Sequence, residues 1–555
     1  MNVEEVQRRL WEQSKIHKQH RKSDLPLFPV NPYEKRIRNL MDLMHQPDWL
    51  QESCERVLVR SRNKASGVDR VTVQKFSNGL EGKLAKLRLE LKCGTYQPQP
   101  VRQVMIPKSN GKMRALGIPC LRDKIVQEAM RMALEPVFEV EFHNNSYGFR
   151  PNRNTHQAVF RCQQLMRSKF SWVIEGDVKA CFDEISHKAI LKALRQKIMD
   201  NKFLDLIHLM LKAGVDVDGV VQPTEKGVPQ GGVMSPLLAN VVLNKLDWFL
   251  HNKGKYGKAH RIVNRHREPN VRFTRYADDW CVFVTRASKR YAEELRKQIQ
   301  IFLLNECGLE LSVEKTHVTN VRDGYDFLGF CLSYGIGQSG RTVPKIKVGQ
   351  KAKQNFLKRV KAAMRYRPHQ ESIAVRIQRG SAVVRGWAEY FRIAHDFTSI
   401  AGTLDHRVFW IAVKTICHKF DITTGKAMKK YYRSNTIQVD EMCQLRKLSE
   451  TSMKMDYRGP KPYMPGSYDP EIDQDMEVNI TRFHEGYRRG SRDIKWQTLQ
   501  RDNYCCCNCG KAVNDHTSQV HHIIPVKRFA SFALANDPDN LQTLCQMCHR
   551  EKHCA

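Results

Sequence analysis

Three acidic residues near the middle of the chain could carry metal-dependent chemistry. Residues 171–177 have the composition of a short strand that ends on Asp177. Further on, Asp278 and Asp279 separate two apolar, strand-like runs. Adjacent carboxylates at a hairpin tip repel each other, and a divalent cation is the usual compensation. Two Mg²⁺ ions about 4 Å apart would suit phosphoryl transfer, because they activate an attacking 3′-oxygen and stabilise the leaving pyrophosphate. A lone Asp-Asp pair is more often a solvated turn.

A second group of chemically active residues lies near the C-terminus. It consists of two C-x-x-C pairs, Cys506 with Cys509 and Cys545 with Cys548. This spacing is typical of a four-thiolate zinc site, and four thiolates leave no position for water, so we expect a structural zinc. A module of about 60 residues has a small core, and the metal would supply much of its folding energy. Cys505 and Cys507 flank the first pair, so the choice of ligands there is not unique.

The elements that must position these residues change along the chain. Residues 61–345 mix strand and helix patterns, whereas residues 350–440 lose the strand pattern and become helical. Within the helical part, apolar residues recur at helical spacing and predict one apolar face: Leu404, Val408, Ile411, Ala412, Thr415 and Ile416. Residues 456–470 are rich in Pro, Gly and Tyr and have the composition of a linker. A compact Cys/His module follows from about Trp496.

The composition favours a multidomain protein that binds a polyanion. The 555 residues exceed one ordinary domain, and 92 Lys and Arg against 58 Asp and Glu give a net charge of +34. Such an excess indicates a nucleic-acid partner, although a generally basic surface is the alternative. No apolar run approaches the ~20 residues of a membrane span, and the charged N-terminus lacks a signal peptide. We therefore expect a cytoplasmic protein with reduced thiols and no membrane partner.

The blocks around the three acids resemble the reverse transcriptase family. Tyr276-Ala277-Asp278-Asp279 resembles its polymerase motif, and Asp177 resembles the acid of its first palm motif. Further blocks agree in order and spacing: 106–108, 114–119, 227–237, 314–315 and 327–330. The last of these would form the strand pair that holds the primer end. The resemblance implies an RNA-directed DNA polymerase whose three acids are catalytic and hold two Mg²⁺ ions.

The same resemblance implies roles for four residues that would meet the incoming dNTP. Lys108 and Arg114 would grip the triphosphate, because anionic groups need cations that survive desolvation. Phe182 falls where the family places an aromatic residue that screens out ribonucleotides by colliding with the 2′-hydroxyl. Core packing is the plainer interpretation of Phe182, and both can hold. Gln230 and the neighbouring glycines would let the backbone approach the template and nucleotide closely.

Two further blocks resemble the bacterial group II intron lineage, in which the encoded protein binds its intron RNA. They are Ser146–Pro151 and Gly67–Asp69. Arg385-Gly386-Trp387 with Tyr390 and Phe391 resembles the maturase segment, which serves as the thumb. By themselves, Trp387 and Tyr390 are better interpreted as core aromatic residues than as RNA contacts. The basic insertion His251–Asn270 is expected to be a loop, either touching nucleic acid or simply solvated.

The C-terminal module resembles the HNH nucleases, which place a hairpin and a helix around one catalytic metal. His549 and His553 are four residues apart and would share one helix face. With His521 they would hold one divalent metal on the scissile phosphate. Imidazole ligands suit several first-row metals, whereas the phosphate favours Mg²⁺, so the sequence leaves the identity of this metal open. His522 would be the general base that deprotonates water, and Asn540 would orient its imidazole. The alternative is a zinc ribbon that only grips DNA, but a ribbon does not need these histidines and Asn540 together.

The expected architecture is α+β and multidomain. It comprises a right-hand polymerase with an antiparallel palm sheet, an α-helical thumb or maturase domain, and a small zinc-containing ββα-metal HNH domain. We divide the chain as follows: 1–60, a basic helical extension; 61–345, fingers and palm; 346–440, thumb and maturase domain; 441–493, a DNA-binding segment and linker; and 494–555, the HNH endonuclease.

The function implied by the resemblance is that of a group II intron-encoded protein active in retrohoming. It would bind its own intron RNA, assist splicing, nick one strand of a double-stranded DNA target and extend that end with dNTPs. Two other hypotheses stay open. One is an RNA-binding splicing cofactor with an idle polymerase, and the other is an HNH nuclease that uses the remaining chain as a scaffold. A retron-type enzyme would share the palm but should lack both the maturase segment and the nuclease tail.

Overall fold

The computed structural model contains two compact units, which are described separately. Unit 1 comprises Met1–Met453 and Pro460–Met476, and unit 2 comprises Lys454–Gly459 and Glu477–Ala555. The described residues are 1–20, 36–62, 64–107, 113–168, 170–259, 269–285, 287–337, 340–365, 371–440, 443–454, 459–460, 463, 465, 492–514, 517–523 and 540–549. Across these ranges, no helix combines the length and apolar character that crossing a membrane would require.

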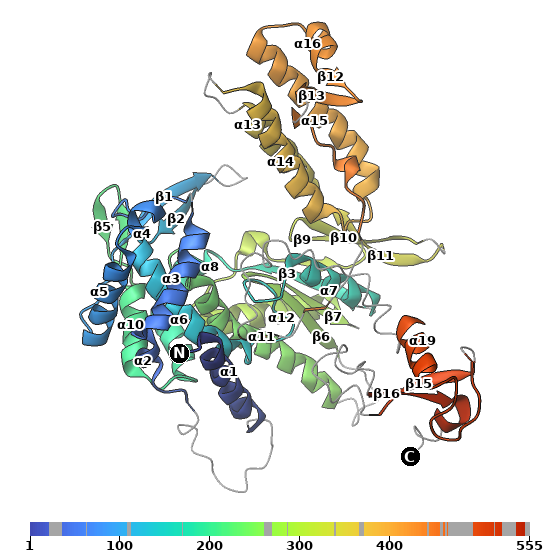
Figure 1. The fold of residues 1–555 in the computed structure, drawn as a ribbon, viewed down its shortest axis with the longest axis horizontal. Helices are drawn as coiled ribbons and strands as arrows, with labels where there is room; N and C mark the ends of the chain where they lie inside the picture. The colour runs from blue at the N-terminus through green and yellow to red at the C-terminus, as the bar shows by residue number, and fades with distance from the viewer. Residues whose placement is uncertain are drawn as a thin grey trace. The chain divides into compact units, whose positions relative to one another are not determined.

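The first part of unit 1 is a helical layer with a small sheet (Figure 1). Its helices are α1 Val3–His20, α2 Leu40–Met44, α3 Pro47–Ser61, α4 Val73–Ser77, α5 Leu80–Cys93, α6 Leu121–Glu139 and α10 Asn201–Leu211. Its strands are β1 Val101–Pro107, β2 Met113–Ile118, β4 Val215–Val217 and β5 Val220–Gln222, in the order β2-β1-β4-β5. Helix α6 is buried almost throughout, and α1, α2 and α3 pack against it. The described part of the predicted N-terminal extension therefore shares the core of this layer.

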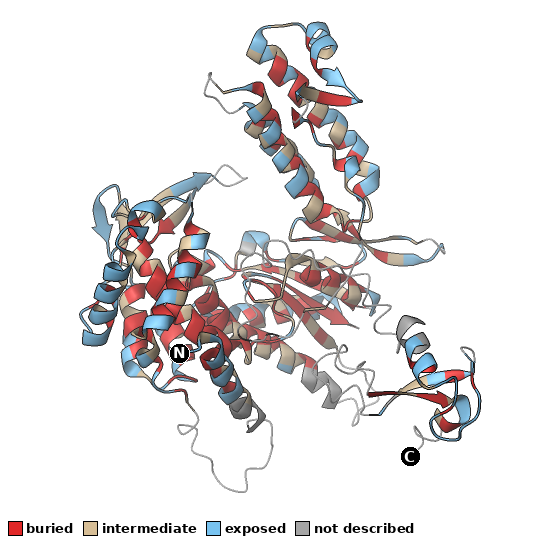
Figure 2. Ribbon diagram, viewed as in Figure 1, coloured by how far each residue is buried: buried red, intermediate tan, exposed pale blue. Residues whose placement is uncertain are grey.

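The predicted palm is an antiparallel sheet with the strand order β6-β7-β3-β8. The strands are β3 Phe170–Asp177, β6 Asn270–Tyr276, β7 Asp279–Thr285 and β8 His317–Asn320. The helices around them are α7 Thr155–Arg167, α8 Cys181–Glu184, α9 His187–Arg195, α11 Ser235–Ala259 and α12 Lys289–Phe302. Strand β7 is buried from its second residue onward, as its continuous apolar run requires, and Figure 2 shows the buried centre of this sheet. The strands predicted to deliver the three acids are thus confirmed.

The predicted loop His251–Asn270 is wrong over its first part. Helix α11 continues to Ala259. Lys253 Nζ donates to Gln298 Oε1 of α12 at 2.8 Å and so attaches this part of α11 to α12. Residues 260–268 lie outside the described residues. Whether this insertion touches nucleic acid stays a prediction.

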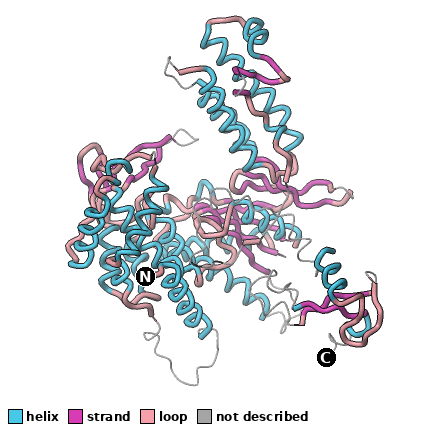
Figure 3. Tube along the Cα trace, in the orientation of Figure 1, coloured by secondary structure: helices cyan, strands magenta, loops and turns pink. Residues whose placement is uncertain are grey.

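A three-stranded sheet joins the palm to a helical bundle, the predicted thumb (Figure 3). The sheet is β9 Tyr325–Phe327, β10 Phe330–Ile336 and β11 Thr342–Val348, and the helices are α13 Gln350–Arg365, α14 Ile373–Phe391, α15 Phe397–Phe420 and α16 Thr424–Tyr431. The predicted apolar face of α15 is buried at every position except Ile411, which is half-buried.

The expectation that residues 350–440 contain no strands is wrong. Short strands follow α16: β12 Tyr432–Arg433, β13 Thr436–Asp440 and β14 Cys443–Gln444. Ser434 and Asn435 form the tight turn between the first two, with φ values of 47° and 63°. Asn tolerates this left-handed region, and the β-branched residues after it favour a strand. The turn chemistry was therefore present in the sequence.

Unit 2 is small. It contains α19 Arg492–Arg501 and the antiparallel pair β15 Ser518–His522 and β16 Leu541–Cys545, and residues 546–549 are helical. Its hydrophobic core consists of Leu499, Cys506, Val513, Leu544 and Cys548. The predicted hairpin of this module is confirmed, while most of the predicted DNA-binding segment 441–493 lies outside the described residues. The domain boundaries at 60, 345, 440 and 493 stay predictions.

Candidate active sites

The three predicted acids converge at one end of the palm sheet. Asp177 is the last residue of β3 and is paired in register with Asp279, the first residue of β7. Tyr276 of β6 is paired with Asp279, so Ala277 and Asp278 form the tip of a tight hairpin. The carboxylates thus come from the end of β3, the start of β7 and the turn that joins β6 to β7. This geometry depends on strand register, which the buried face of the sheet fixes.

Burial and like charge together raise the pKa values of the acids in this site, and burial is the larger cause. Desolvation raises the pKa of Asp279 to about 7, and the charges of Asp278 and Asp177 add to the shift. Desolvation is also the largest cause of the raised pKa of Asp278, followed by repulsion from Asp177. Lys315 Nζ lies 2.5 Å from Asp177 Oδ2 and offsets part of this charge. A cluster of carboxylates that resists full ionisation fits a divalent-cation site, because oxygen ligands and uncompensated negative charge suit Mg²⁺.

A buried ion pair beneath the hairpin holds its turn in place. Arg275 and Asp247 are both fully buried, with Arg275 Nε and Nη2 lying 2.8 and 2.6 Å from the two carboxylate oxygens of Asp247. Arg275 Nη1 also donates to the carbonyl oxygen of Ala277, the residue before Asp278, at 2.8 Å. Ala277 has a φ of 57°, a strained conformation that persists only where its surroundings impose it. We did not anticipate this pair from the sequence.

Close packing fixes the same hairpin from its sides. A Cβ atom on Gly148 would lie 2.3 Å from the backbone nitrogen of Ala277, and one on Gly176 would lie 2.1 Å from the Trp280 ring. Only glycine fits at either position. Asn240 Nδ2 donates to the Gly148 carbonyl at 2.8 Å, which ties the predicted Ser146–Pro151 block to helix α11. This block therefore shapes the acid site.

The structure describes three of the four residues that were predicted to bind the nucleotide. Arg114 on β2 is close enough to the acids to lower the pKa of Asp278, and Lys108 lies outside the described residues. Phe182 is half-buried in edge-to-face contact with Phe149, with ring centroids 6.0 Å apart. Gln230 Nε2 donates to both carboxylate oxygens of Asp183 at 2.8 Å. Phe182 thus packs as the plainer interpretation requires, and its contact with a sugar stays a prediction.

The aromatic residues of the predicted maturase block are packing residues. Trp387 is buried, with its ring centroid 4.6 Å from that of Phe356. Tyr390 stacks on Phe330 at 5.4 Å, and its hydroxyl donates to the carbonyl of Leu328 at 2.9 Å. Their interpretation as core aromatic residues is confirmed. These contacts fix helix α14 to the β9–β10 hairpin that was predicted to hold the primer end.

In unit 2, the four predicted thiols come together. The Sγ atoms of Cys506, Cys509, Cys545 and Cys548 all lie within 4.8 Å of one another. Burial alone would raise the pKa of Cys506, but hydrogen bonds from backbone N–H groups of Cys545, Cys509 and Asn508 outweigh it and hold this pKa at about 6. A low thiol pKa favours the thiolate that binds metal. The donor set fits tetrahedral zinc, and neither Cys505 nor Cys507 belongs to the cluster.

The predicted nuclease residues are placed in part. His521 lies on β15, and its ring centroid is 5.6 Å from that of His549. Asn540 is buried immediately before β16, and its carbonyl accepts a hydrogen bond from the Ile523 N–H at 2.8 Å. His522 is on β15, but its side chain lies outside the described residues, as does His553. The structure therefore brings together His521 and His549, and the roles of all five residues stay predictions.

Comparison with known families gives three matches in order along the chain. Residues 106–332 match the family described as "Reverse transcriptase (RNA-dependent DNA polymerase)". Residues 353–432 match "Group II intron, maturase-specific domain", and residues 506–554 match "HNH endonuclease". The three matches fall on the palm with part of the fingers, on the helical bundle, and on unit 2.

This chain aligns with most of the length of two curated relatives. Protein YkfC of Escherichia coli strain K12 is 40% identical over 339 residues, which covers 56% of this chain and 88% of that protein. Group II intron-encoded protein LtrA of Lactococcus lactis subsp. cremoris is 28% identical over 555 residues, covering 85% of this chain and 88% of LtrA. Among solved structures, telomerase from Candida albicans aligns with a TM-score of 0.32 and 14% identity over 63% of this chain and 64% of that chain.

Proposed function

The chain belongs to the group II intron-encoded proteins, which combine a reverse transcriptase, a maturase domain and an HNH endonuclease, and we propose how its residues divide this work. The protein is an RNA-directed DNA polymerase and a nuclease, and it binds RNA and DNA. The observation that carries the polymerase assignment is the register of β3 and β7, which sets Asp177 opposite Asp279 beside Asp278. The assignments of individual residues, ions and partners that follow are our proposals.

In the palm, we assign Asp177, Asp278 and Asp279 as ligands of two Mg²⁺ ions. Bound Mg²⁺ supplies activation of the primer 3′-oxygen and stabilisation of the leaving pyrophosphate. Arg114, whose charge already reaches Asp278, binds the triphosphate together with Lys108. Their positive charge holds the dNTP against the acids. The protein residues thereby orient the two reacting groups.

Two further residues shape the position of the nucleotide. Phe182 packs edge to face against Phe149. In our proposal its ring collides with the 2′-hydroxyl of a ribonucleotide, and Phe182 thereby selects deoxynucleotides. Gln230 is held by Asp183, and its carbonyl accepts a hydrogen bond from the N–H of Gly117 at 2.7 Å. It therefore ties the segment under the new base pair to strand β2 of the fingers.

In unit 2, we assign zinc to the four clustered thiols as a structural ion and a second divalent ion, Mg²⁺, to the nuclease centre. His521, His549 and His553 hold that second ion, and His522 removes a proton from water with Asn540 orienting its ring. The close approach of His521 and His549 supports two of the three ligands. The zinc cluster is a separate site, because its four thiols complete a tetrahedral set.

We propose that these activities form one retrohoming cycle in the bacterial cytoplasm. The protein binds the intron RNA that encodes it and stabilises the RNA fold for splicing. The ribonucleoprotein then inserts the RNA into one strand of a double-stranded DNA target. Unit 2 nicks the other strand, and the palm extends the new 3′-hydroxyl with dNTPs. The basic surface, with its net charge of +34, supports the binding of both nucleic acids.

Primer extension on an RNA template tests the polymerase assignment. The purified protein should extend an annealed DNA primer in Mg²⁺, and the Asp177→Asn variant should not. A chain that promotes splicing but extends no primer would instead be the splicing cofactor with an idle polymerase. A chain that nicks DNA but neither splices nor extends would be a nuclease on a scaffold.

A further inference from the structure

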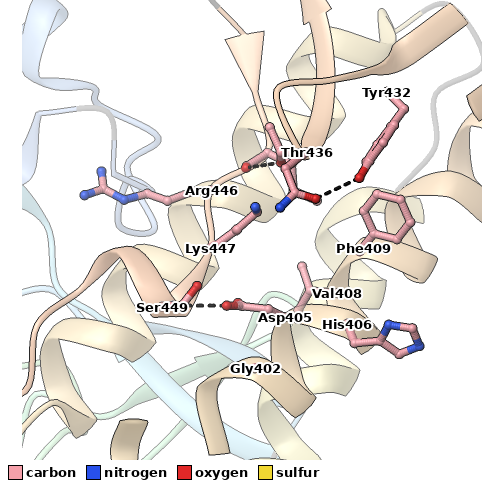
Figure 4. A pocket seen from close by; sticks show the side chains of 12 residues that line it. Gly402, Asp405, His406, Val408, Phe409, Tyr432, Thr436, Arg446, Lys447 and Ser449 are labelled. Atoms are coloured by element: carbon pink, nitrogen blue, oxygen red, sulfur yellow. Dashed lines mark hydrogen bonds between the residues drawn. The ribbon is translucent and has the colours of Figure 1, made fainter.

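A hollow of about 330 Å³ lies in the thumb between helix α15 and the chain that returns across it after β12 (Figure 4). One wall is a face of α15 that carries Asp405 and Phe409, and the other wall carries Tyr432, Thr436 and Lys447. The match to the maturase family ends at residue 432, so most of the second wall lies beyond it. None of the polymerase or nuclease residues assigned above lines this hollow.

Hydrogen bonds fix the floor and walls of the hollow in advance. Asp405 Oδ1 accepts from the Leu448 N–H at 2.6 Å, and Asp405 Oδ2 accepts from the Ser449 N–H at 3.0 Å. Thr436 is buried, and its hydroxyl donates to the carbonyl of Leu445 at 2.9 Å. A site whose walls are already bonded loses little conformational entropy on binding. The hollow therefore has a fixed shape rather than one that a ligand must create.

Two aromatic rings stand at one side of the hollow. The rings of Phe409 and Tyr432 meet edge to face, with centroids 5.8 Å apart and an interplanar angle of 81°. The Tyr432 hydroxyl donates to Asn435 Oδ1 at 2.7 Å, which fixes the ring although the residue is 38% exposed. An exposed aromatic ring held in one orientation is the platform on which proteins stack unpaired bases.

The charge of the hollow is positive. Lys447 is half-buried, and throughout the described ranges no acidic oxygen lies within ion-pair distance of its ammonium group. The carboxylate of Asp405 is already occupied by two backbone N–H groups. Figure 4 shows the Lys447 side chain on the wall opposite Asp405 and Phe409. A half-buried lysine without an acid partner favours an anion, and phosphate is the anion of nucleic acids.

We propose that this hollow holds one unpaired nucleotide of the bound RNA, with its base against Phe409 and Tyr432 and its phosphate at Lys447. This inference deepens the proposed function, since it assumes that the maturase domain binds RNA. A base inside a duplex is stacked on both faces and cannot reach rings inside a hollow. The ligand is therefore a bulged, looped or terminal nucleotide. Binding of an unpaired base in the hollow would let the thumb recognise the shape of the RNA in addition to its phosphates.

A fluorescent RNA tests this proposal in the full-length protein. The probe is a short RNA duplex with one bulged 2-aminopurine ribonucleotide, whose emission falls when the base stacks on an aromatic ring. Binding should quench the probe with the natural protein and with Tyr432→Phe, which keeps the ring. Tyr432→Leu should lose the quenching and bind about tenfold more weakly, within the range for one stacked base. Lys447→Gln, which removes the charge and keeps a polar side chain, should lower the salt dependence of binding by about one phosphate contact.

Three results would overturn the proposal. Quenching that survives in Tyr432→Leu would place the base elsewhere. Equal weakening of a fully paired duplex by these variants would mean a general phosphate-binding surface. Equal quenching of a bulged DNA probe would remove the assignment to RNA. Primer extension on an annealed template is measured alongside: its absence in the natural protein contradicts the proposed polymerase, whereas the quenching result bears on the hollow alone.

Discussion

The palm and unit 2 both place acid or thiol side chains in tight groups, but they hold those groups by different means. In the palm, two of the acids stand at strand ends and Asp278 stands in the adjoining turn. The strands belong to a large buried core, and the Arg275–Asp247 pair holds the turn in place. Among the described residues of unit 2, the core has five buried residues, and two of the four clustered thiols, Cys506 and Cys548, belong to it. We therefore expect the palm site to form without metal, and we expect unit 2 to depend on the proposed zinc for its folding.

This difference means that removing a metal ligand should have opposite consequences in the two regions. In the palm, the ionised acids destabilise the folded state. Desolvation and like charge disfavour the ionised forms, and they therefore raise the pKa values of Asp278 and Asp279. In unit 2, each of the four clustered thiols would be a ligand of the proposed zinc, on which we expect the small core to depend. Loss of activity without loss of fold is expected in the first case, and loss of both in the second.

Asp278→Asn should have the largest effect on activity. We expect cDNA synthesis to fall by more than about a thousandfold, because one carboxylate of the metal site is lost. The unfolding temperature should stay the same or rise, since the change relieves repulsion. Primer extension and thermal unfolding measure the two effects, with the exposed Asp323→Asn as the control for removing an acid. A clear fall in the unfolding temperature would contradict the contrast with unit 2.

Cys548→Ser should unfold unit 2 and leave the palm active. The zinc site would lose one of four thiolates, and the small core cannot compensate. Limited proteolysis should then cleave unit 2 rapidly and nicking should vanish, while extension of an annealed primer persists. Cys505→Ser is the matched control, because Cys505 is exposed and outside the cluster. A protease-resistant Cys548→Ser protein would show that zinc is not what holds the unit.

Arg275 should support the acids as a positioning residue and not only as part of the core. Arg275→Met leaves Asp247 buried and unpaired, which should destabilise unit 1 by about 3–5 kcal/mol. Adding Asp247→Leu should restore most of that stability. The turnover rate should stay low in the double variant, because the Ala277 carbonyl still lacks its donor. Denaturant unfolding measures the stability of each variant, and steady-state kinetics gives separate kcat and KM values. If the double variant recovered both its stability and its kcat, the Arg275–Asp247 pair would contribute only to packing and would not position the acids.

The smallest expected effect is a change in the Mg²⁺ requirement with pH. The pKa of Asp279 is raised from its ordinary 3.8 to about 7, so the folded chain favours the protonated form. In metal-free protein, this group therefore lowers stability as pH rises from about 4 to about 7. Protons and Mg²⁺ compete for the same oxygens, so below pH 7 the half-saturating Mg²⁺ concentration should rise by up to about tenfold per pH unit. A half-saturating concentration that stays flat from pH 6 to pH 8 would contradict this.

Much of the acid site could be predicted from the sequence because its signals are local. The apolar runs beside Asp278 and Asp279 predict the two strands, and the register then brings Asp177 opposite Asp279. The two C-x-x-C pairs likewise identify the thiols that converge. In each case a short pattern determines the geometry that the chemistry needs.

The supports of these sites depend on distant contacts that local patterns do not reveal. Arg275 occupies an outwardly ordinary strand position, and Asp247 sits within an apolar helix. A buried acid on one apolar element and an arginine on another are the signal that could have suggested the pair. The strands after α16 were missed for another reason: they are two to five residues long, too short to show a period. One wall of the thumb hollow is formed by the chain segment that contains these short strands, so the hollow could not be predicted from the sequence either.

The independence of the two regions can be measured with a chain truncated after Met476, which keeps all of unit 1 and removes the main segment of unit 2. The assay is extension of a DNA primer already annealed to an RNA template, so that no nick is required. We expect the truncated protein to extend the primer within about twofold of the full chain and to lose nicking entirely. A collapse of primer extension in the truncated protein would contradict the independence of the palm and the zinc unit.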